Sequence, residues 1–183
     1  MTRTQRRLVL TPEDIERVLQ RMAHQIYEYN ARGDLALVGI LKRGDTLARR
    51  LKPKIDQLYG RDIPLGILDI ALYRDDIGMT DIAPEVRSTD IPFDVHNKDI
   101  VLIDDVLYTG RTIRSALNAL MDLGRPRQVQ LLVLIDRGHR ELPIQADFTG
   151  KELTTYANEQ VTVRLREVDR EDGVYIEIPD EEA

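Results

Sequence analysis

Short apolar runs that alternate with helical stripes restrict the fold of this 183-residue chain more than any other feature. The runs at 35–40, 99–104 and 129–135 are typical of strands that are buried on both faces of a sheet. Apolar residues recur at helical spacing in three further stretches, at 12–29, 47–58 and 112–123. Strands that alternate with helices predict an α/β fold with a mostly parallel, doubly wound sheet.

Capping and turn-forming residues mark the limits of the predicted helices. Thr11 suits an N-cap and Pro12 the first helical position, whereas Gly124 ends the third helix. Pro53 is expected to kink or shorten the second helix, because its ring clashes with the preceding turn. The rest of the pattern predicts short strands at 65–73, 161–168 and 174–178, and connections at 74–92 and 137–156.

The composition is that of a globular protein, with 42% hydrophobic and 32% charged residues. We expect one domain over residues 1–179 and an acidic tail at 180–183. No apolar run approaches the roughly 20 residues of a membrane span, and residues 8–10 are too few for a signal-peptide core. The absence of cysteine excludes disulfides, thiolate metal sites and a cysteine nucleophile. A cytoplasmic protein without a membrane partner is the simplest expectation.

Charge is unevenly distributed along the chain, whose formal net charge is −6. Residues 1–60 hold 12 Lys and Arg against 7 Asp and Glu, whereas residues 61–183 hold 14 against 25. A basic third on an acidic protein indicates either a polyanion-binding face or a merely solvated surface.

The segment 101–112 carries the clearest chemical pattern. A buried strand ends in Asp104 and Asp105, and the turn 109–112 then opens a helix. Such a turn presents backbone N–H groups, hydroxyls and a helix N-terminus to a phosphate, while adjacent carboxylates accept bonds from two neighbouring hydroxyls. A ribose 5-phosphate fits this combination. The plainer alternative is an acidic strand end followed by an ordinary capped turn.

This segment resembles the phosphoribosyl pyrophosphate (PRPP) loop of type I phosphoribosyltransferases. Its version Asp-Asp-Val-Leu-Tyr-Thr-Gly-Arg-Thr at 104–112 is similar to that of the PyrR family, which combines pyrimidine operon regulation with uracil phosphoribosyltransferase activity. Residues 72–76, 90–92 and 136–144 match the same family in order and spacing. The resemblance covers nearly the whole chain.

The resemblance implies a type I phosphoribosyltransferase fold with a small hood at about 136–157. It implies transfer of ribose 5-phosphate from PRPP to uracil, which gives UMP and pyrophosphate and requires Mg²⁺. Asp104 and Asp105 would be catalytic, holding the ribose hydroxyls and indirectly the metal. The remaining residues of the ribose 5-phosphate site would be Val106, Leu107, Tyr108, Thr109, Gly110, Arg111 and Thr112.

Other site residues follow from the same resemblance. Purine-specific relatives have an acid at the position of Tyr108, which argues against a hypoxanthine or guanine substrate. The pyrophosphate loop would be Leu41, Lys42 and Arg43, although a basic surface turn is the alternative. Residues 74–90, with Arg74 and Asp75, would form a lid, or else a plain loop. Arg137 and Val161 would flank the uracil.

The family's second role is nucleotide-dependent binding of the leader mRNA of pyrimidine genes, which attenuates transcription. The residues that match its RNA face are Arg21, His24, His139 and Lys151. The residues that depart from it are Gln20, Tyr29, Lys42 and Gln145. Two arginines that could make bidentate phosphate contacts are thereby lost. Both histidines are equally compatible with a surface position that binds nothing.

Three functions therefore stay open. The chain is an enzyme that makes UMP and also binds RNA, an RNA-binding nucleotide sensor with little turnover, or a phosphoribosyltransferase for another base. The resemblance also implies a homo-oligomer, dimer or higher.

Overall fold

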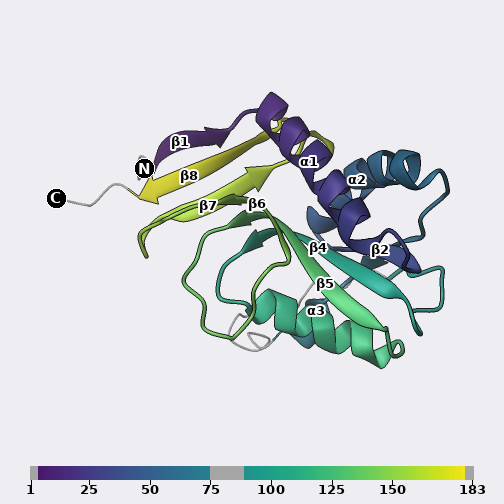
Figure 1. Cartoon of the computed structure of the whole chain (residues 1–183). Helices are drawn as coiled ribbons and strands as arrows, with labels where there is room; N and C mark the ends of the chain where they lie inside the picture. Colours follow the sequence, from purple (N-terminus) through teal and green to yellow (C-terminus); the bar gives the residue numbers. More distant parts are fainter. Residues whose placement is uncertain (1–3, 75–88, 180–183) are drawn as a thin grey trace.

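The computed structural model describes residues 4–74 and 89–179 of the chain (Figure 1). Two predicted segments lie outside the described residues. They are residues 75–88 of the expected lid, which include Asp75, and the acidic tail at 180–183. The elements follow one another in this order: β1 (Thr4–Leu10), α1 (Pro12–Asn30), β2 (Leu35–Ile40), α2 (Gly44–Tyr59), β3 (Leu65–Leu68), the 3₁₀ turn η1 (Ala71–Tyr73), β4 (Asp99–Leu107), α3 (Arg111–Asp122), β5 (Gln128–Asp136), β6 (Phe148–Glu152), β7 (Gln160–Arg164), α4 (Arg166–Asp169) and β8 (Gly173–Pro179).

A five-stranded parallel sheet forms the centre of the molecule. Its strand order is β3-β2-β4-β5-β6, and each neighbouring pair is parallel. Helices α1 and α2 cover one face and α3 covers the other (Figure 1). The predicted doubly wound parallel sheet is therefore confirmed. Ligands of such sheets bind at the carboxyl ends of the strands, which here include the end of β4.

Strand β4 lies between two apolar layers. Val101 and Ile103 belong to the core under α1 and α2, while Ile100 and Leu102 belong to the core on the α3 side. All four side chains are fully buried. Alternation along the strand explains why this run is apolar throughout, and burial on both faces fixes its register.

A second, three-stranded antiparallel sheet is built from the two ends of the described chain. Its order is β1-β8-β7, and Val163, Val174 and Ile176 extend the core beneath α1. Strand β1 was not predicted, because its residues 4–7 are polar and only 8–10 are apolar. Residues 136–157, expected to form a hood, contribute strand β6 to the main sheet.

Several predicted boundaries were wrong. The strand expected at 65–73 ends at Leu68 and is followed by η1, and the one expected at 161–168 ends at Arg164 and is followed by α4. The connection 137–156 contains β6, whose mostly polar residues hide an edge strand that pairs with β5. Helix α2 continues past Pro53 to Tyr59, and Pro53 lies on the exposed side of the helix.

The predicted start of α1 and the predicted end of α3 agree with the structure. The Thr11 side chain accepts from the Asp14 backbone N–H at 3.1 Å, and the Asp14 carboxylate accepts in return from the Thr11 N–H at 3.0 Å. This capping box satisfies two N–H groups at the start of α1. Gly124 follows the end of α3 with a φ of +152°. Within the described ranges, no helix is both long and apolar enough to span a bilayer.

Candidate functional site

The acid pair lies where strand β4 meets the start of helix α2. Asp104 is only 4% exposed. A Cβ atom at Gly44 would lie 2.4 Å from the Ile103 carbonyl oxygen and 3.1 Å from the Asp104 Cα. Glycine at this position therefore lets the first turn of α2 approach the carboxyl end of β4. The start of α2, a kind of helix end that is suited to anions, therefore lies beside two carboxylates.

Burial dominates the electrostatics of the acid pair. It raises the pKa of Asp104 well above its ordinary value, and the neighbouring Asp105 charge raises it further. Burial also raises the pKa of Asp105, although the Val106 N–H at 2.8 Å and the Arg43 charge oppose that rise. The Asp105 N–H donates to Asp104 Oδ1 at 2.9 Å. Two carboxylates held this way need hydroxyl donors or a cation to compensate their burial.

These raised pKa values predict a pH-dependent cost of the acid pair. A carboxyl whose folded pKa exceeds its unfolded value stabilises the fold below the unfolded value, and this contribution is lost as the pH rises through the folded pKa. Wild type should therefore lose stability relative to Asp104→Asn/Asp105→Asn as the pH rises above about 4. Urea denaturation at pH 4 and pH 8 measures this difference, and an equal difference at both pH values would contradict the assignment.

The turn that follows the pair is held from outside by residues 141–144. The Thr109 carbonyl accepts from the backbone N–H groups of Glu141 at 2.9 Å and Leu142 at 3.1 Å. Gly110 has a φ of +93° and is the N-cap residue directly before α3. Arg111 Nε donates to Glu141 Oε2 at 2.6 Å across a half-exposed ion pair. The loop is thus a turn held by backbone hydrogen bonds at the N-terminus of α3, a position that suits a phosphate.

Arg140 is a residue of this site that sequence reasoning missed. Its guanidinium and Nε donate to the Tyr108 carbonyl at 2.9 Å, the Ile144 carbonyl at 2.7 Å and Asp136 Oδ2 at 2.5 Å. Burial alone would raise the pKa of Asp136, but the bonds from Arg140 and the Gly138 N–H lower it. Arg140 therefore ties the end of β5 to the turn. Its place inside the matched motif 136–144 was the available signal.

Tyr108 and Arg137 face each other beside the turn. The Arg137 guanidinium lies 4.0 Å from the centroid of the Tyr108 ring, and its Nη2 donates to the Glu159 carbonyl at 2.9 Å. Arg137 is 6% exposed and Val161 9%. Glu159 directly precedes β7 and stands two residues before Val161. Arg137 and Val161, the two expected uracil neighbours, therefore lie in one region.

The expected pyrophosphate loop is joined to α4, the short helix that connects β7 to β8. Arg43 Nη2 lies 2.8 Å from Asp169 Oδ1, and its Nε lies 3.2 Å from Asp169 Oδ2. The hydrogen bonds to Asp169 raise the pKa of Arg43, and the Asp105 charge adds to this. Asp169 Oδ2 also accepts from the Leu165 N–H at 2.9 Å. Asp169 was missed, since 126 residues separate it from Arg43.

Three of the four expected RNA-binding residues lie along the seam between α1 and β6. Arg21 Nη2 donates to the Gly150 carbonyl, next to exposed Lys151, and His24 bonds Gln20 one turn earlier at 3.3 Å. His139 is placed instead in the loop after β5, where its ring nitrogen bonds the Thr155 carbonyl at 2.7 Å. Arg74 is exposed directly after η1.

Comparison with known proteins identifies the family and the fold of this chain. The family model described as "Phosphoribosyl transferase domain" matches residues 9–165. A hypoxanthine phosphoribosyltransferase from Staphylococcus aureus superposes with a TM-score of 0.70 at 23% identity, covering 96% of this chain and 93% of that one. The Trypanosoma cruzi hypoxanthine phosphoribosyltransferase gives 0.72 at 16% identity, covering 95% and 97%. The chain is therefore a phosphoribosyltransferase of the type I fold.

Relatives with more than half of their residues identical show which family of phosphoribosyltransferases the chain belongs to. It is 56% identical over 169 residues to the "Bifunctional protein PyrR" of Pelotomaculum thermopropionicum, covering 92% of this chain and 93% of that protein. It is 54% identical over 167 residues to the protein of the same name from Thermus thermophilus, covering 91% and 92%. The chain belongs to the PyrR family, as the resemblance of its acid-pair segment predicted.

Proposed function

We propose that this protein transfers ribose 5-phosphate from PRPP to uracil, releasing UMP and pyrophosphate, and that it also regulates pyrimidine genes by binding leader RNA. The observation that carries the enzymatic proposal is the buried acid pair at the end of β4, placed between the N-terminus of α2 and the turn that opens α3. The two carboxylates match the ribose hydroxyls of PRPP. The N-termini of α2 and α3 match its pyrophosphate and its 5′-phosphate.

Positioning and charge stabilisation supply the catalysis, because the reaction needs little covalent chemistry from the protein. The turn Thr109–Thr112 holds the 5′-phosphate with N–H groups and hydroxyls. Asp104 and Asp105 hold the ribose hydroxyls, and their negative charge favours the cationic sugar that forms as pyrophosphate leaves. Arg43 and the first turn of α2 receive the departing pyrophosphate. Tyr108 and Arg137 bound the base site.

Mg²⁺ fits the donors at this site. Carboxylate oxygens are hard ligands, and Mg²⁺ is usually held by one or two of them together with substrate phosphates. In residues 4–74 and 89–179 there is no cluster of three or more acidic or histidine side chains that would hold a metal by itself. Asp104 and Asp105 would hold the ion through PRPP. When bound, Mg²⁺ neutralises charge on the diphosphate.

A turnover assay tests this reaction. Labelled uracil, PRPP and Mg²⁺ should yield UMP, and unlabelled uracil should compete while hypoxanthine and guanine should not. A wild-type protein that binds UMP but makes none would instead be a nucleotide sensor. Competition by a purine base would identify a phosphoribosyltransferase for another base.

Asp169 is expected to act as a positioning residue for the pyrophosphate loop. Its two oxygens hold the Nε and Nη2 edge of Arg43. Asp169→Asn should raise the KM for PRPP about tenfold and leave kcat within about threefold of wild type. The reason is that Arg43 would bind the diphosphate less well in the substrate complex and in the transition state alike. Steady-state kinetics with varied PRPP measure this split. Glu171→Gln, a nearby acid paired with Arg6 and Arg164, is the matched control. An unchanged KM would refute the positioning role.

The RNA-binding part is supported by the cations along the α1–β6 seam. Arg21 and Lys151 lie together there, where they can meet phosphates. A gel shift with leader RNA should appear in the presence of UMP and weaken in Arg21→Ala, with UMP synthesis unchanged. Loss of synthesis and RNA binding together would indicate unfolding of that variant.

The proposal includes a homo-oligomer, dimer or higher. Exposed apolar side chains support it, because Leu72 and Met121 flank the hydrogen bond from the Tyr73 hydroxyl to Asp122 at 2.7 Å. Light scattering on the purified protein gives its mass, and a monomer at micromolar concentration would refute this part.

A further inference from the structure

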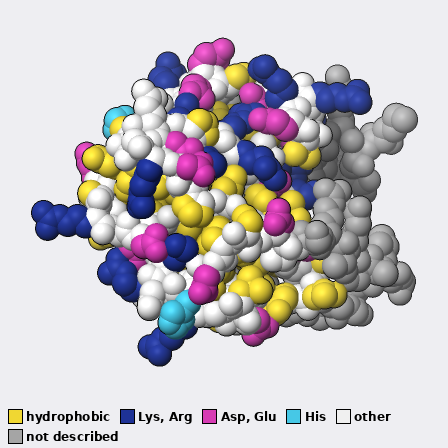
Figure 2. Space-filling model, turned by 90° about the vertical axis from the view of Figure 1, so that its right-hand side faces the viewer, with side chains coloured by type: hydrophobic (Ala, Val, Ile, Leu, Met, Phe, Trp, Pro, Cys, Tyr) yellow, Lys and Arg dark blue, Asp and Glu magenta, His cyan; other side chains and the backbone are white. Residues whose placement is uncertain are grey.

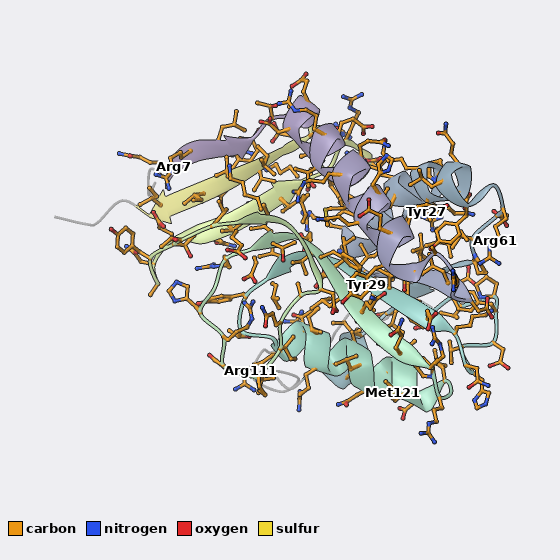
Figure 3. The ribbon with its side chains drawn as sticks, viewed as in Figure 1. Arg7, Tyr27, Tyr29, Arg61, Arg111 and Met121 are labelled. Carbon is orange, nitrogen blue, oxygen red and sulfur yellow. The ribbon has the colours of Figure 1, made fainter. Side chains whose placement is uncertain are left out.

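A polar pocket of about 310 Å³ lies at the opposite end of the main sheet from the acid pair. It is formed where β2, β4 and β5 begin, and these strands are parallel, so it is separate from the PRPP site. Figure 3 marks the two ends of α3 with Arg111 and Met121, and Tyr29 lies toward the Met121 end. The lining residues are Tyr29, Asn30, Arg32, Gly33, Asp34, Asn97, Asp99, Arg127 and Gln128.

The pocket contains a buried carboxylate that is only half satisfied. Asp99 is fully buried, and its Oδ2 accepts from Arg127 Nη2. Its Oδ1 has no hydrogen-bond partner among the described residues. Gly33 makes room for this arrangement, since a Cβ there would lie 2.0 Å from Asp99 Oδ2. A buried acceptor without a donor is costly, so a donor from a bound molecule would be stabilising here.

The surrounding groups suit an aromatic, phosphorylated ligand. Tyr29 is 77% exposed, and its ring meets Phe148 edge to face at 6.0 Å, which holds the ring while leaving most of it open for stacking. Arg32 is exposed, and the Arg127 side chain is 59% exposed, so both guanidinium groups can reach a phosphate at the pocket mouth. Figure 2, which shows the right-hand side of Figure 1, has basic and acidic side chains interleaved on this face.

We propose that this pocket binds one nucleotide whose base carries an exocyclic amino group. The base stacks on Tyr29, its amino group donates to Asp99 Oδ1, and its phosphate pairs with Arg32 and Arg127. Uracil is disfavoured, because its N3–H lies between two carbonyl oxygens that a carboxylate repels. The volume lies at the small end of the range for ligand pockets. This inference goes beyond the proposed function and does not depend on uracil transfer.

Calorimetry on the full chain tests the pocket. With the catalytic site saturated by UMP, CMP, AMP and GMP are titrated as probes, and at least one should bind at one further equivalent per chain without displacing UMP. Arg127→Ala and Tyr29→Ala should each weaken that binding at least about tenfold. Arg17→Ala removes an exposed charge elsewhere on α1 and should change nothing. Binding that displaces UMP, or that both pocket variants retain, overturns the proposal.

A second assay identifies the source of the nucleotide. If the pocket receives a base of the bound RNA, Arg127→Ala and Tyr29→Ala should weaken the leader-RNA gel shift, and free CMP or AMP should compete with the RNA. If it receives a free nucleotide, the two variants should bind RNA as wild type does while losing the calorimetric signal. Variants that match wild type in both assays overturn the proposal, whether or not the protein makes UMP.

Discussion

Replacing Asp104 and Asp105 together by asparagine is expected to lower the rate of UMP formation about 1000-fold, because both negative charges that face the developing cationic sugar are removed. The two side chains keep their shape, so the loss reports charge and hydroxyl binding rather than packing. The measurement is kcat/KM for PRPP with labelled uracil at saturating Mg²⁺.

Stability separates a chemical loss from an unfolded protein in this experiment. The raised pKa of Asp104, caused first by burial and then by Asp105, means that the charged pair destabilises the fold at neutral pH. The double variant should therefore unfold at a higher temperature than wild type while losing activity. Asp62→Asn, at an 89% exposed side chain paired with Lys52, is the control and should keep full activity. Activity of the double variant within tenfold of wild type would remove the acid pair from the mechanism.

Local patterns account for what the sequence predicted correctly. The strands of the parallel sheet were visible because residues such as Ile100 to Ile103 are buried on both faces and are therefore apolar throughout. The segment around Asp104 was visible because strand, acid pair and turn are adjacent in the chain. The strand and the turn that opens α3 are both encoded in a dozen neighbouring residues.

Contacts between distant segments account for what the sequence missed. Strand β1 exists because it pairs with β8 at the other end of the chain, and its own residues carry little β signal. The Arg43–Asp169 pair joins the start of α2 to the end of α4, which are far apart in the chain. The pocket around Asp99 takes residues from three separate strand starts. Single-chain periodicity holds no information about such pairings.

Gly44→Ala is expected to damage both stability and activity, because the new methyl group has no space. It would lie 2.4 Å from the Ile103 carbonyl oxygen. The clash is with backbone atoms of β4, which cannot rotate away as the end of a side chain could. Overpacking of this kind costs about 2–3 kcal/mol of unfolding free energy. To relieve the clash, the start of α2 would have to move away from Asp104. A shift of about 1 Å in a catalytic site costs on the order of 100-fold in rate.

A glycine just after the same helix distinguishes this effect from a general loss of backbone freedom. Gly60 follows α2 at a φ of +63°, and apart from its two chain neighbours no atom lies within 4 Å of where a Cβ would stand. Gly60→Ala should therefore cost only about 1 kcal/mol of unfolding free energy, from the left-handed backbone alone, and leave kcat/KM unchanged. Urea denaturation and turnover assays on both variants give the comparison. If Gly44→Ala behaved like Gly60→Ala, close contact between the start of α2 and the end of β4 would not be what builds the pyrophosphate side of the site.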